Sequence, residues 1–136
     1  MDQLTSKDLA LYRLKSAQDR LLVAQQLFDL GHYMDAASKS YYAIFQAARA
    51  VLATIELDSR KHSGVISLFN LHFVKTGILP KEFRKIIISA QDLRLASDYD
   101  DFYIVSRKDA EQSLQNARTF IAGIEQYLNS QYGSQA

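Results

Sequence analysis

Arg94 and Tyr99 are five residues apart, so both side chains could face one cleft if a helix continues that far, and Asp98 lies between them. Arg94 lies four residues after Ala90 and eleven after Phe83, so it shares the apolar stripe of a predicted helix. In that position the side chain either extends along the rim with its guanidinium in water or turns into a groove, and periodicity alone favours the rim. Asp98, four residues further on, could pair with Arg94 along the helix, and an incoming phosphate would then compete for the guanidinium.

A second polar cluster lies between two predicted helices and consists of Arg60, Lys61 and His62. It could contact a phosphate, but runs of charge are usually solvated, and composition alone favours a solvated loop that also suits the end of the preceding helix.

A cluster of carboxylates and a group of aromatic residues could each bind a ligand, but a structural role is favoured for both. The carboxylates of Asp98, Asp100 and Asp101 could bind a hard cation such as Mg²⁺, but the glycine and the bidentate Glu of a calcium loop are absent, so a polar or helix-capping run is favoured. Three aromatic side chains could stack on nucleobases, but they are expected in the core: Tyr41, Tyr42 and Phe45.

Several kinds of site are excluded by residue type and spacing. The sequence has no cysteine, so it has no disulfide, thiolate zinc site or cysteine nucleophile. None of its Glu residues is followed by His three residues later, which argues against a di-iron centre. It also lacks a glycine-rich phosphate loop and a Gly-x-Ser-x-Gly elbow. No metal and no cofactor are therefore expected.

The overall composition is that of one globular domain. The chain has 136 residues, and 16 Lys and Arg balance 15 Asp and Glu to give a formal net charge of +1, so it is not a general polycation that coats nucleic acid or membrane. Met1-Asp2-Gln3 is unlike a signal peptide, and no apolar stretch approaches the roughly 20 residues of a membrane helix. A cytoplasmic protein is expected.

The elements that would position these residues are helices. Apolar residues spaced three and four apart predict long helices over residues 6–29 and 33–57, and two more after Pro80 and after Ser106, with a shorter one from Ser63 to Gly77. Thr5 with Asp8, and Ser106 with Asp109, can cap helix starts, whereas residues 97–105 lose the pattern and indicate a loop. The prediction is an all-α, antiparallel up-and-down bundle of four long helices and one short helix. It forms one domain over residues 1–129, followed by a disordered tail over residues 130–136.

Three passages of the sequence together resemble the HEPN family of small helical domains from prokaryotic toxin–antitoxin and defence systems. These passages read DAASKSYYAIFQAARAVL at residues 35–52, KHSGVI at residues 61–66 with its continuation to Gly77, and RLASDYDDF at residues 94–102. The resemblance covers the chain to about Leu128. It is strongest to the stand-alone HEPN proteins that are encoded beside a minimal nucleotidyltransferase.

The resemblance implies a metal-independent endoribonuclease motif, in which an Arg and a His are separated by four to six residues and lie near a dimer interface. Arg94 matches the Arg, and Tyr99 stands where the His is expected, while His32, His62 and His72 all lie upstream. A Tyr with a pKa near 10 is a poor general base at neutral pH, so the departure puts nuclease activity in doubt.

Three hypotheses follow. The first is the toxin-side component of a HEPN/minimal nucleotidyltransferase pair that forms a homodimer and binds RNA or nucleotide. The second is an endoribonuclease that uses Arg94 with Tyr99 or His62, and the third is a helical adaptor without a ligand. For the site, we expect Arg94, Asp98 and Tyr99 to line one cleft at a dimer interface, with Lys61 or His62 close enough to add positive charge.

Overall fold

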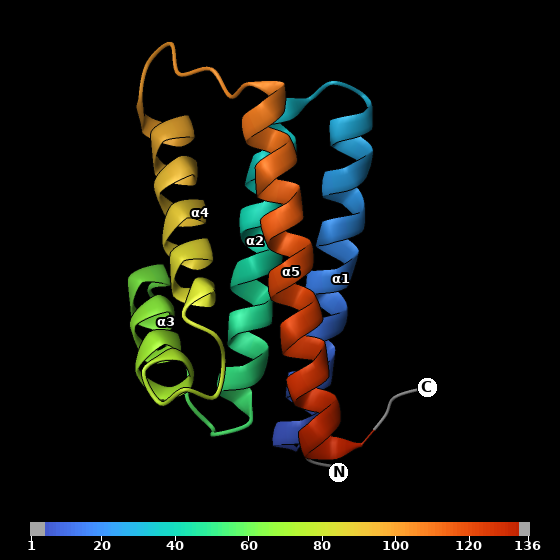
Figure 1. The fold of residues 1–136 in the computed structure, drawn as a ribbon, viewed down its shortest axis with the longest axis vertical. Coiled ribbons are helices and arrows are strands. Elements are labelled where there is room, and N and C mark those ends of the chain that lie inside the picture. Colours follow the sequence, from blue (N-terminus) through green and yellow to red (C-terminus); the bar gives the residue numbers. More distant parts are fainter. Residues whose placement is uncertain (1–4, 134–136) are drawn as a thin grey trace.

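Five helices, four long and one short, make up the fold in the computed structural model, which describes residues 5–133. They are α1 (Ser6–Asp29), α2 (Tyr33–Ala53), α3 (His62–Phe69), α4 (Glu82–Tyr99) and α5 (Arg107–Tyr132), and a π-helical turn, η1 (Asn70–Val74), continues α3. The four long helices run up, down, up and down, and α3 lies beside the lower half of α4 (Figure 1). The predicted all-α antiparallel bundle is confirmed.

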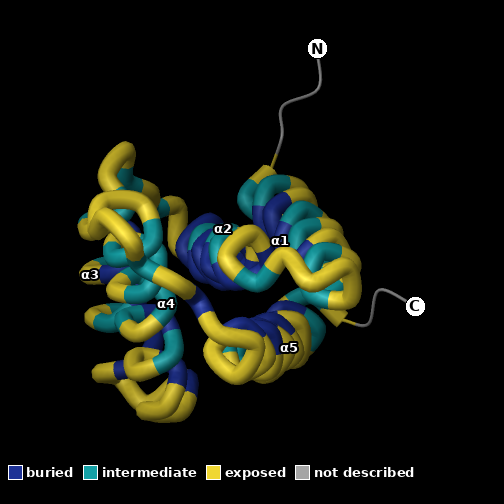
Figure 2. Tube along the Cα trace, turned by 90° about the horizontal axis from the view of Figure 1, so that it is seen from above, coloured by how far each residue is buried: buried dark blue, intermediate teal, exposed yellow. Residues whose placement is uncertain are grey.

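Helix α2 is the centre of the bundle and packs against each of the other four helices. The view along the bundle shows it between α1, α4 and α5 (Figure 2). More than half of its buried residues are alanines, whose small side chains let neighbouring backbones come close. These alanines are Ala36, Ala37, Ala43, Ala47, Ala48, Ala50 and Ala53. On α1, the predicted apolar seam faces this core: Ala10, Leu14, Ala17 and Ala24 are buried, and Leu21 and Phe28 are half-buried.

The predicted signals at helix ends function as expected. Thr5 and Asp8 form a reciprocal capping box at the start of α1, and the Ser106 hydroxyl accepts a hydrogen bond from the backbone N–H of Asp109 at the start of α5. Gly31 follows the end of α1 with a φ of +83°, a left-handed conformation that glycine adopts without steric cost.

Several predicted boundaries were wrong. Helix α2 ends at Ala53 rather than near Leu57, and α3 starts at His62 with Lys61 as its cap, so Ser63 is already helical. The expected loop at residues 97–105 begins only at Asp100, because α4 continues to Tyr99. The apolar pattern disappears there, but an ion pair four residues apart still supports the helix.

Helix α5 reaches Tyr132, past the boundary expected at residue 129. The last residues of the expected tail, 134–136, and the start of the chain, Met1-Asp2-Gln3, lie outside the described residues. Among residues 5–133, no helix is long and apolar enough to cross a membrane.

Candidate phosphate-binding site

The side chain of Arg94 turns inward from α4 and covers two tyrosines of α2. Its guanidinium carbon lies 5.6 Å from the ring centroid of Tyr41 and 5.6 Å from that of Tyr42, and the side chain is 21% exposed. A guanidinium over aromatic faces is stabilised by the negative potential of the rings, the more so where water is excluded. The side chain is thus turned inward over the two rings, and the rim position that periodicity favours was wrong.

Asp98 pairs with Arg94 as the four-residue spacing predicts. Arg94 Nε lies 3.1 Å from Asp98 Oδ2, but its N–H makes no aligned hydrogen bond, so the contact is an ion pair with spare donor capacity. Burial on its own would lower the pKa of the Arg94 guanidinium, but nearby Tyr42 and Asp98 outweigh it and raise the pKa, so Arg94 stays charged.

His62 joins this cluster from the first position of α3. Its Nδ1 lies 2.7 Å from the hydroxyl oxygen of Tyr41, and its ring stacks on Phe45 with centroids 4.1 Å apart. Burial, and then the charges of Arg94 and Arg49, lower the pKa of His62 below its ordinary 6.5, so the imidazole is neutral at pH 7. Burial also raises the pKa of Tyr41 to about 12, so its phenol keeps its proton. The hydrogen bond fixes the imidazole through Nδ1 and does not engage Nε2.

The remaining predicted site residues lie further from this cluster. Lys61 is exposed beside His62 and forms no ion pair with any described residue. Tyr99 is the last residue of α4 and is 74% exposed, and among the described residues the guanidinium of Arg94 stacks on Tyr41 and Tyr42 rather than on Tyr99. Asp100 and Asp101 are exposed in the following loop, and within residues 5–133 no three carboxylate or imidazole groups gather as a metal site would require.

A network that the sequence did not indicate lies on the other side of His62. Asp58 accepts hydrogen bonds from Arg13 Nη2 at 2.8 Å and from Arg49 Nη2 at 3.0 Å. Arg13, whose side chain is 9% exposed, also donates to the backbone carbonyl of Arg49 at 3.1 Å. Burial on its own would raise the pKa of Asp58, but the hydrogen bonds from Arg49 and Ser59 and the charges of both arginines lower it below 3.8. A signal for Arg49 existed, because it follows Tyr41 and Phe45 at four-residue intervals on α2.

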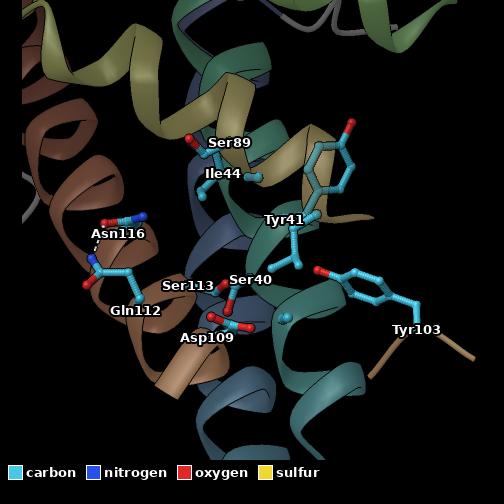
Figure 3. A pocket seen from close by; sticks show the side chains of 12 residues that line it. Ser40, Tyr41, Ile44, Ser89, Tyr103, Asp109, Gln112, Ser113 and Asn116 are labelled. Atoms are coloured by element: carbon cyan, nitrogen blue, oxygen red, sulfur yellow. Dashed lines mark hydrogen bonds between the residues drawn. The ribbon is translucent and has the colours of Figure 1, made fainter. Parts of the chain in front are cut away.

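Tyr41 and Phe45 are buried, as predicted for core residues, while Tyr42 is half-buried. Tyr41 also borders a pocket of about 210 Å³ between α2, α4 and α5. Figure 3 shows Tyr103, Ser40, Asp109 and Ser113 around this pocket. Its lining contains a carboxylate, hydroxyls and amides but no cationic side chain, so it does not suit a phosphate.

Comparison with known proteins shows that this chain is similar to one protein family and to several individual proteins. A family model described as the HEPN domain matches residues 10–127. A protein of Methanocaldococcus jannaschii named "Putative toxin" is 35% identical over 115 residues, 85% of this chain and 85% of that protein. A second protein of that organism, named in the same way, is 32% identical over 117 residues, 86% of this chain and 80% of its own length. A "UPF0332 protein" of Thermotoga maritima is 30% identical over 117 residues, 86% of this chain and 89% of its own.

Proposed function

Because the chain belongs to the HEPN domain family, we propose that it is the toxin-side component of a toxin–antitoxin pair and that it binds RNA or nucleotide through Arg94. One observation carries the proposal: Arg94 is held inward over Tyr41 and Tyr42, with the neutral His62 fixed against the same Tyr41. A guanidinium in such a position can bind a phosphate through two parallel N–H donors.

Asp98 acts as an internal competitor in this proposal. In the free protein it partly neutralises Arg94. An incoming phosphate takes over the guanidinium, and the Asp98 side chain, which is 42% exposed, then relaxes into water at little cost. The pairing thus keeps the arginine ordered until a ligand arrives.

The proposed partner is a minimal nucleotidyltransferase, and the proposed assembly is a homodimer with the Arg94 cleft at its interface. The family resemblance and two relatives named as toxins support a partner. Exposed apolar side chains outside the bundle core support an interface, since Leu22 is 61% exposed and Leu95, next to Arg94, is 40% exposed. Light scattering on the purified protein, alone and with the product of the adjacent gene, tests both proposals. A strict monomer at micromolar concentration would contradict the homodimer.

Endoribonuclease activity is a second candidate function, and the position of His62 favours it. In the tautomer in which Nδ1–H donates to the Tyr41 hydroxyl oxygen, the neutral imidazole has its lone pair on Nε2 and is suited to accept a proton from an attacking 2′-hydroxyl at pH 7. Tyr99, with its exposed hydroxyl, can reach an RNA only from the edge of the site or across a dimer. Cleavage assays on Tyr99→Phe and His62→Gln separate the two, because loss of cleavage in one variant identifies the group that moves the proton.

Titration of the wild type and Arg94→Ala with labelled RNA tests the proposed function. A lost charge-assisted contact costs about 1.5–3 kcal/mol, so the affinity should fall by about 10- to 150-fold. Arg84→Ala removes the same charge from an exposed position on α4 without a side-chain partner among the described residues, and it should bind as the wild type does. Circular dichroism checks folding, and Arg94→Lys, which keeps the charge but lacks the fork, should be intermediate. Undiminished binding in Arg94→Ala would refute the site, and a wild type that neither binds nor cleaves would favour the adaptor.

A further inference from the structure

His62 also lines a second, basic pocket, to which Arg94 does not contribute. Six residues line this open hollow of about 580 Å³: Phe45, Arg49, Asp58, Ser59, Arg60 and His62. We propose that this pocket is a second phosphate subsite, so that the ligand is a single-stranded RNA with at least two phosphates rather than a mononucleotide. The inference rests on the proposed function and specifies its substrate.

The pocket has a surplus of positive charge. Its one carboxylate, Asp58, already accepts hydrogen bonds from Arg13, Arg49 and the backbone N–H of Ser59, so its charge is more than balanced by the two arginines. Arg60 is exposed and pairs with no carboxylate of the described chain. An anion entering the pocket therefore finds an uncommitted guanidinium and no unpaired carboxylate to repel it.

The loop that carries Arg60 has a defined shape. Asp58 Oδ1 accepts from Ser59 N at 2.8 Å, and Ser59 Oγ accepts from Lys61 N at 3.2 Å. Gly64 on α3 packs directly under Ser59, where an added Cβ would lie 2.8 Å from the Ser59 Cβ. The first residues of α3 and the loop are thus locked together, which fixes the backbone of Arg60 relative to His62.

The two subsites lie along one face of α2. Tyr41, Phe45 and Arg49 follow one another at four-residue intervals, so they are stacked on that face over about 12 Å of helix. Arg94 covers the Tyr41 end, Arg49 stands at the other end, and the His62 ring lies on Phe45 between them. That both arginines lower the pKa of His62 agrees with its position between two cations. A ligand with one phosphate can engage one end, whereas a nucleotide chain engages both.

The inference is tested with two probes, uridine 5′-monophosphate and an octauridylate with 2′-O-methyl groups, which cannot be cleaved by 2′-hydroxyl attack. Arg60→Ala should weaken binding of the octamer by about three- to tenfold and leave the monophosphate within twofold. It should also reduce the slope of log affinity against log salt by about 0.7, the value for one lost contact to a single strand. Arg94→Ala should weaken both probes. Arg84→Ala is the charge-matched control and should change neither.

The outcomes separate this inference from the proposed function. Octamer binding that is unchanged in Arg60→Ala but weakened in Arg94→Ala overturns the second subsite and leaves the first intact. Equal weakening by Arg60→Ala and Arg84→Ala also overturns it, because the effect is then one of net charge. Unchanged binding of both probes in Arg94→Ala overturns the proposed function itself. Because Arg60 is exposed and forms no ion pair with residues 5–133, its replacement should leave the thermal midpoint unchanged, and the titration then reports on binding alone.

Discussion

Replacing Asp58 by alanine should destabilise the protein and at the same time strengthen its binding of RNA. Asp58 is the carboxylate that holds Arg13 and Arg49 together. Removing it leaves Arg13, whose side chain is 9% exposed, with one remaining hydrogen bond, to the backbone carbonyl of Arg49. It also removes a negative charge from the basic pocket, and the anion affinity should rise for that reason.

The magnitude follows from the two ion pairs. The hydrogen bond to the largely buried Arg13 contributes about 1.5–2 kcal/mol, toward the lower part of the range for charged groups because Asp58 itself is 43% exposed. The pair with Arg49, whose side chain is 28% exposed, adds about 0.2–1 kcal/mol. The sum is about 2 kcal/mol. For a chain of this length, that loss lowers the thermal midpoint by about 8 °C.

Urea unfolding at pH 7 measures this loss, and Asp101→Ala, an exposed loop carboxylate without a partner among the described residues, is the control. The pKa of Asp58 is lower in the folded state than its ordinary 3.8, so its contribution is present above that pH and is lost as the pH falls through the folded value. The difference between wild type and variant should therefore be complete at pH 7 and shrink below pH 3.8. A difference under 0.5 kcal/mol at pH 7 would refute the reasoning.

Three further predictions concern the same face. The pKa of His62 is lowered on folding, so the unfolded chain takes up the proton first and the free energy of unfolding should fall as the pH drops through 6.5. His62→Gln should remove this part of the pH dependence. Urea titrations from pH 5 to 8 that give the same profile for the variant and the wild type would contradict the prediction. Gly64→Ala should cost about 1–3 kcal/mol in thermal unfolding, because the new methyl group meets Ser59, and a gain in stability would show that the loop yields freely. Tyr41→Phe, which loses one hydrogen bond to His62, should cost about 0.5–1.5 kcal/mol in urea unfolding with circular dichroism unchanged, and a neutral result would mean that the bond contributes nothing to stability.

The helices could be predicted because the residues that determine each helix lie within it or next to its ends. The seam from Ala10 to Phe28 on α1 alternates four and three residues apart, and Thr5 and Gly31 mark where that helix begins and ends. The end of α4 could not be predicted in this way. Its last turn has lost the apolar pattern and is held by the Arg94–Asp98 pair, which the four-residue spacing of the two charges indicates but the apolar periodicity does not.

The site was predictable only in part, because its contacts join distant positions. Arg94 could be placed on the apolar stripe of its helix, but its inward turn depends on Tyr41 and Tyr42, about fifty residues earlier in the chain. The pairing of Arg13 with Asp58 spans 45 residues, and neither residue has a spacing that indicates the other. Tyr99 follows from the motif alone, because its side chain is exposed at the end of α4 and has no spacing that links it to a distant residue.

The alanine-rich centre of the bundle limits which substitutions α2 can accept during evolution. Ala47 and Ala48 have no exposed surface, and any larger side chain there must push a neighbouring helix outward at about 1–3 kcal/mol. Those neighbours carry separate parts of the site, Arg13 on α1 and Arg94 on α4, so a displaced helix misaligns ligand-binding groups even where the protein still folds. The buried alanines of α2 therefore set the distances between the chemical groups, and they should tolerate less variation than the exposed charged residues such as Arg60 and Lys61.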